Sequence, residues 1–224
     1  MRNLLFLATL VLTLSCKQTD TKQRPADPPK DSKFKNLLTK YKDISFDTLK
    51  VFSAEDPDSK SYKYKGTKLD TTDVLLFPEA IAEQYLNDDG YFACYKFYID
   101  IGKIGLITRT PSTYASSSIK LLILDKQKDA ITDMIELAET FGDAGDMAEK
   151  ISWLLRDDLK KYKSFTWVEE SHDHSVEDEK DTTVEKWSNY YLIDISKSKI
   201  DTVSKDEKLL TKRFKKLLVG QASR

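Results

Sequence analysis

Glycine and cysteine are scarce in this chain, with seven glycines and two cysteines among 224 residues. Two cysteines cannot build the disulfide framework of a small secreted domain. Seven glycines exclude collagen-like and glycine-rich repeats. An excess of either charge is also missing, because 36 Lys+Arg oppose 37 Asp+Glu. A near-neutral chain lacks the basic surplus that phosphate backbones attract, so nucleic acid is not an expected partner.

Common catalytic motifs are missing as well. The chain has no glycine-rich phosphate loop, no His-Glu-x-x-His and no Gly-x-Ser-x-Gly sequence. Hydrophobic residues nevertheless make up 40% of the chain, and it carries 10 Phe, 11 Tyr and 3 Trp. That supply is enough for one folded core of ordinary size. We expect no cofactor, and the sequence favours a protein that is not an enzyme.

The N-terminus has the features of an export signal. Arg2 precedes an apolar run over residues 4–12, interrupted only by Thr9. The run is shorter than the roughly 20 residues that span a bilayer. It ends in Thr13-Leu14-Ser15-Cys16, after which the chain turns polar. A small residue directly before a cysteine that ends an apolar run resembles the lipobox of bacterial lipoproteins. Thr13 stands where that family prefers leucine. The alternative is a plain secretory signal with an incidental cysteine.

The resemblance to lipoproteins implies a membrane address. It implies a lipoprotein signal peptide over residues 1–15, cleavage after Ser15, and lipidation of Cys16 by a diacylglyceryl thioether and a further fatty acid such as palmitate. Two or more acyl chains hold a protein stably on a membrane. Lys17, rather than aspartate, follows the cysteine. By the family's sorting rule this implies the outer membrane, with the periplasmic and cell-surface faces both left open.

The rest of the chain divides by composition. Residues 16–33 are polar and contain three prolines, which predicts a flexible lipid-anchored tether. A coil of that length spans roughly 20–25 Å r.m.s.. Residues 34–218 predict a single β-rich globular domain, and residues 219–224 a disordered tail.

The periodicity of apolar residues predicts an α+β fold that is mainly β. Helical spacing indicates a short helix over residues 34–41 and a basic amphipathic C-terminal helix with the apolar stripe Leu210, Phe214, Leu217 and Leu218. Residues 74–77 form an apolar run typical of a short buried strand. Alternation over residues 91–101 predicts a strand with the odd-numbered side chains on one face.

Three later segments each consist of an apolar run, a charged or polar turn, and a second run, and they cover residues 119–138, 151–168 and 187–203. This form is typical of β-hairpins and predicts an antiparallel meander. Residues 130–141 remain ambiguous. Their apolar spacing, followed by Gly142, fits a helix, whereas the tight turn at 125–129 favours the return strand of a hairpin. Residues 141–146 fit a turn between strands better than a calcium loop.

The two histidines of the chain, His172 and His174, are weak candidates for metal ligands. Imidazole and carboxylate are ligand types that zinc and copper use, and three acidic residues follow at 177–179. Residues 169–185 hold eight acids and one lysine, and we expect a mobile surface loop there. Because a spacing of two in a loop does not prearrange a tetrahedron, and no third firm ligand stands out, we expect no specific metal site here but a solvated acidic loop that binds divalent ions loosely.

Other features leave their alternatives open. Cys94 is expected to pack as a small hydrophobe. The basic C-terminal helix either packs on the sheet or contacts anionic headgroups. Exposed aromatics either stack on sugars or pair across strands.

The whole pattern resembles the uncharacterised Bacteroidota-type envelope lipoproteins with β-rich bodies. The resemblance implies a non-catalytic binding or structural module, anchored through Cys16, with an envelope polymer or a protein as its partner. The alternative is a carboxylate-based, glycan-directed envelope hydrolase.

Overall fold

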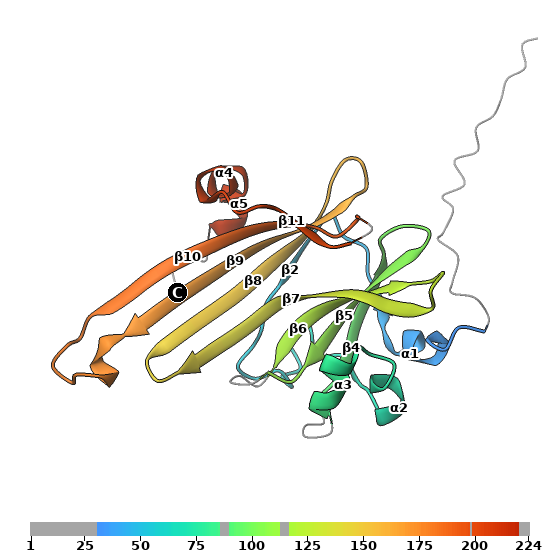
Figure 1. Ribbon diagram of the computed structural model, residues 1–224, viewed down its shortest axis with the longest axis horizontal. Helices are drawn as coiled ribbons and strands as arrows, with labels where there is room; N and C mark the ends of the chain where they lie inside the picture. The colour runs from blue at the N-terminus through green and yellow to red at the C-terminus, as the bar shows by residue number, and fades with distance from the viewer. Residues whose placement is uncertain (1–30, 86–89, 113–116, 198, 220–224) are drawn as a thin grey trace, which may run out of the picture.

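The computed structural model describes residues 31–85, 90–112, 117–197 and 199–219 (Figure 1). The predicted signal peptide, Cys16, most of the tether and the tail after residue 219 lie outside these described residues. Within the described part, no helix is long and apolar enough to cross a membrane. The chain is mainly β, with 47% strand and 16% helix, which confirms the coarse fold prediction.

The strands form one open sheet of eleven members. Eight consecutive strands each run antiparallel to the next: β4 (Phe92–Tyr98), β5 (Lys103–Thr110), β6 (Ser118–Asp125), β7 (Ala130–Asp143), β8 (Asp146–Arg156), β9 (Tyr162–Asp173), β10 (Val184–Asp194) and β11 (Asp201–Ser204). Three short strands join them. β1 (Lys42–Asp43) and β3 (Thr67–Lys68) pair with β4, and β2 (Thr48–Val51) pairs with β8. Because β1 is parallel to β4, the sheet is mixed rather than purely antiparallel.

Residues 130–141, ambiguous in the sequence, belong to the 14-residue strand β7. Its first part pairs with β6 and its last five residues pair with β8, so β7 joins the two halves of the sheet. The β6–β7 register shifts twice, which leaves Thr132 and Leu137 as extra residues. Such bulges break the alternation of period two, and this explains why the apolar spacing of a strand imitated a helix.

Helices cover the two ends of the sheet on separate hydrophobic clusters (Figure 1). Three short helices pack on β4, β5 and β6: α1 (Lys35–Lys40), α2 (Thr71–Val74) and α3 (Glu79–Tyr85). Two others pack on β8, β9 and β10: α4 (Glu207–Arg213) and α5 (Lys215–Leu218). A third, central cluster joins side chains of β2, β4, β6 and β7.

Two local predictions are wrong. Residues 74–77 are not a strand, because Asp70 and Asp73 form a capping box that starts α2. The odd-numbered side chains of β4 do not share one face, because the register shifts between Ala93 and Tyr95. Ala93 therefore packs against the helices, while Cys94 and Phe97 join the central cluster.

Candidate metal centre

The candidate site lies at the far tip of the β9–β10 hairpin. β9 ends at Asp173, a 3-10 helix η1 (His174–Val176) follows, and β10 begins at Val184. The predicted loop over residues 169–185 is therefore shorter than expected at both ends. Its first five residues belong to β9 and pair with β8 and β10, and its last two belong to β10. The Asp173 carboxylate accepts a hydrogen bond from the Ser175 amide and caps η1.

The turn between β7 and β8 is tightly packed against this tip. Ala144 and Gly145 both have positive φ, at 48° and 89°, as a two-residue hairpin turn requires. A Cβ on Gly145 would lie 2.8 Å from the carbonyl oxygen of Asp173. The close approach brings Asp146, the first residue of β8, directly opposite His172 in β9.

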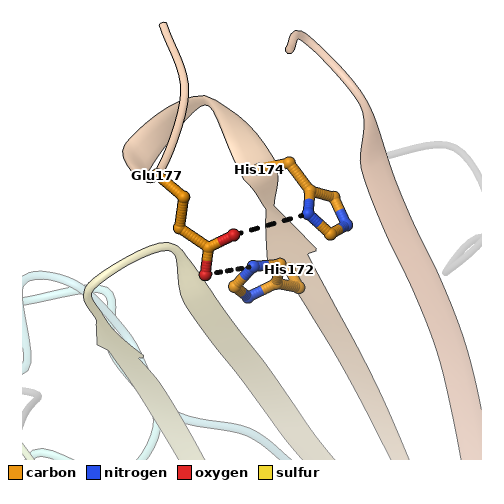
Figure 2. A group of neighbouring side chains, drawn as sticks. All are labelled: His172, His174 and Glu177. Carbon is orange, nitrogen blue, oxygen red and sulfur yellow. Dashed lines mark ion pairs between the residues drawn. The ribbon is translucent and has the colours of Figure 1, made fainter.

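His172, His174 and Glu177 point toward one another (Figure 2). One ligand atom from each residue lies within 4.8 Å of the others. His172 Nε2 is 3.4 Å from Glu177 Oε1, and His174 Nδ1 is 3.7 Å from Glu177 Oε2. The histidine rings meet nearly edge to face, with centroids 4.6 Å apart. The strand end and the single turn of η1 thus bring together two imidazoles that sequence spacing alone did not orient.

These distances are close to those of a coordination shell. Zinc bonds to nitrogen or oxygen are about 2.0–2.2 Å, so neighbouring ligands on a tetrahedron lie about 3.3–3.6 Å apart. The Glu177 side chain is 66% accessible and has room to rotate toward such a shell, while the two ring nitrogens lie within 4.8 Å of each other. Three protein ligands leave one tetrahedral position for water.

The nitrogen of His172 that faces away from Glu177 has a carboxylate partner, because Nδ1 is 2.7 Å from Asp146 Oδ1. The corresponding Nε2 of His174 is 3.9 Å from Glu185 Oε1, beyond hydrogen-bond distance. Metal-binding histidines characteristically donate their second ring N–H to such a group, which fixes the tautomer and the ring orientation. The hydrogen bond to Asp146 also holds the pKa of His172 above its ordinary value.

The sequence named the two histidines and the acidic run after them, and the structure brings His172, His174 and Glu177 together. Within the described residues, neither Asp178 nor Glu179 belongs to that cluster. Asp146 lies 26 residues before His172, and sequence spacing carries no indication of it. Only the β8–β9 register reveals the pairing.

The cysteine within the described residues, Cys94, is buried. Cys94 is 2% exposed, and its Sγ donates to the carbonyl oxygen of Tyr64 at 3.1 Å. Burial raises the pKa of the thiol to about 12. The side chain packs in the central cluster, as predicted for a small hydrophobe.

Two further polar features lie on the sheet. On β7, Glu136 pairs with Lys120 and Lys150. Burial acts against ionisation, but the hydrogen bond and charge of Lys150 hold the pKa of Glu136 below its usual value. A separate groove of about 550 Å³ lies over β8–β10, and its lining includes Phe52, Glu55, Met147, Glu149, Glu169 and Lys186.

Comparison with known proteins adds no identification. No protein-family model matches the chain, and neither the curated proteins nor the solved structures contain a match.

Proposed function

We propose that this protein is a lipid-anchored module of the cell envelope that binds a divalent transition-metal ion and does not itself catalyse a reaction. One observation carries the metal assignment: His172, His174 and Glu177 each place a ligand atom within 4.8 Å of the others. Two imidazoles and a carboxylate form a donor set typical of zinc. The hydrogen bond between Asp146 and the far side of the His172 ring supports it further.

Calorimetric titration with Zn²⁺ tests the proposal. The full chain carrying Cys16→Ala is used so that lipid does not enter the measurement. We expect a single Zn²⁺ site, lost in His172→Ala/His174→Ala and weakened strongly in Glu177→Gln. The control Asp178→Asn/Glu179→Gln removes two charges from the same tip and should retain the site. If the control lost the heat of Zn²⁺ binding to the same extent, or if the histidine variant lost none of it, the tip would be an acidic loop that binds ions loosely.

The lipobox resemblance supports a lipid anchor on Cys16, and Lys17 after it supports the outer membrane. The domain then lies on either the periplasmic or the cell-surface face. Because the Cys94 thiol is buried in the core, Cys16 is the cysteine available for modification. We expect Cys16→Ala to release the protein from the membrane fraction and to abolish labelling by a fatty-acid probe. Cys94→Ala is the matched control and should leave labelling unchanged. Persistent labelling of Cys16→Ala would refute the lipobox assignment.

A glycan-directed hydrolase is the second candidate, and the groove over β8–β10 favours it. Glu149 and Glu169 both line the groove and are direct cross-strand partners. Paired carboxylates are what glycoside hydrolysis requires. Release of soluble fragments from envelope glycans by the wild type, abolished by Glu149→Gln or Glu169→Gln but not by Glu179→Gln, would support the enzyme. Absence of any release would eliminate it.

A further inference from the structure

The two C-terminal helices have one face fixed on the sheet. Leu210 is completely buried in the cluster formed with Trp153 and Phe165. The Phe214 ring stacks on the Phe165 ring, with centroids 4.3 Å apart. Of the two alternatives left by the sequence, the apolar stripe therefore packs on the sheet. This packing sets the rotation of α4 and α5, and their opposite face is directed to solvent.

That outer face is strongly basic. All six bases between residues 205 and 216 are exposed: Lys205, Lys208, Lys212, Arg213, Lys215 and Lys216. They face only two acids, and Asp206 is used as the cap of α4, where it accepts a hydrogen bond from the Leu209 amide. Among the described residues, no carboxylate lies within ion-pair distance of the four lysines in α4 and α5.

Two exposed aliphatic side chains accompany these charges. Leu209 is 54% exposed and Val219, directly after α5, is 74% exposed. Basic groups with neighbouring aliphatic side chains are the combination that binds the headgroup region of anionic membranes, where charge and apolar burial act together. A purely electrostatic partner such as a soluble polyanion makes no use of the exposed aliphatic residues.

We propose that the outer face of α4 and α5 docks on an anionic lipid surface and orients the domain there. The acidic tip with His172 lies far from this face. Along β9, His172 is seven residues beyond Phe165, against which α4 packs, or roughly 24 Å at about 3.4 Å per residue. The tip carries eight acids over residues 169–185. Attraction of the basic face and repulsion of the acidic tip therefore both direct the tip away from the lipid.

Vesicle co-sedimentation tests this docking. The full chain carrying Cys16→Ala is mixed with vesicles of phosphatidylcholine alone or of phosphatidylcholine and phosphatidylglycerol in equal parts. All samples keep the N-terminal apolar run, so its contribution is the same throughout. We expect preferential binding to the anionic vesicles and a loss of this preference at high salt. Lys208→Gln/Lys212→Gln/Lys215→Gln/Lys216→Gln should lower the partition coefficient at least tenfold, since each base contributes about fivefold.

The matched control removes four exposed lysines elsewhere: Lys35→Gln/Lys42→Gln/Lys60→Gln/Lys161→Gln. It makes the same change in net charge and should retain most of the binding. Leu209→Ser should weaken binding to vesicles without affecting that to soluble dextran sulfate. Equal losses in the two lysine variants, or no preference of the wild type for anionic vesicles, would overturn the proposal. If Leu209→Ser bound vesicles as well as the wild type, and the protein bound dextran sulfate more tightly than vesicles, the partner would be a soluble polyanion and not a lipid surface. None of these outcomes depends on the metal site.

Discussion

Asp146 allows a sharp test of the metal centre, because it contacts His172 without being one of the three ligands. Its Oδ1 is 2.7 Å from Nδ1 of His172 and accepts a hydrogen bond from the ring N–H there, which leaves Nε2 to face Glu177. Asp146→Asn retains an oxygen that can accept this hydrogen bond but removes the charge. One charge about 7 Å from a divalent ion is worth about 1 kcal/mol in a water-like medium. Loss of such outer partners typically costs about 10- to 100-fold in affinity.

We therefore expect the Kd for Zn²⁺ to rise about tenfold in Asp146→Asn and toward about 100-fold in Asp146→Ala. Calorimetric titration measures both. Asp143→Asn is the matched control, because it removes the same charge from the other side of the same hairpin turn. An Asp146→Asn affinity within about twofold of wild type, or an equal fall in the control, would refute the role assigned to Asp146.

Protonation provides a second measurement of the same contact. The hydrogen bond to Asp146 raises the pKa of His172, and zinc binds only neutral imidazole. Affinity should fall as the pH drops through that raised pKa, and Asp146→Asn should move this fall to lower pH. Without metal, the protonated His172–Asp146 pair stabilises the fold at acidic pH, and this contribution disappears as the pH rises through the folded-state pKa. A stability gap between wild type and Asp146→Asn that widens with rising pH would contradict this.

Three further predictions concern the fold. Leu210→Ala should lower the free energy of unfolding by about 2–5 kcal/mol in urea titrations. The control at the exposed neighbour, Leu209→Ala, should lower it by less than about 0.5 kcal/mol. Equal losses would show that α4 does not pack on the sheet. Gly105→Ala would set a Cβ 2.6 Å from an aromatic ring of β4 and should cost about 1–3 kcal/mol, while Gly102→Ala, with its nearest atom at 3.5 Å, should be nearly neutral; a stable Gly105→Ala would refute the close contact. In Cys16→Ala protein, the thiol of Cys94, with a pKa of about 12, should react with a disulfide reagent only after denaturant is added; rapid reaction of the native protein would contradict its burial.

Local patterns in the sequence predicted the elements that local interactions decide. The spacing of four apolar side chains indicated the region of α1. All four lie in one buried cluster: Phe34, Leu37, Leu38 and Tyr41. The mainly β character followed from repeated runs and polar turns. The strand predicted over residues 74–77 was wrong because a short apolar run fits a strand or a helix equally well. The capping box formed by Asp70 and Asp73 decides in favour of the helix.

Long-range pairing decided what the sequence could not reveal. The bulges in β4 and β7 depend on register with neighbouring strands, and each one moves side chains to the other face. The metal site shows the same limit. His172 and His174 were visible as ligand types, but their common orientation depends on the end of β9 and the turn of η1. Asp146 joins them only because the β7–β8 hairpin packs beside β9.

X-ray absorption at the zinc edge tests the metal centre most directly. On the full chain with one equivalent of Zn²⁺, we predict a first shell containing two imidazole nitrogens and a carboxylate oxygen at about 2.0–2.2 Å. The imidazole contribution should vanish in His172→Ala/His174→Ala and persist in Asp178→Asn/Glu179→Gln. A shell made only of oxygen atoms in the wild-type protein would contradict the account.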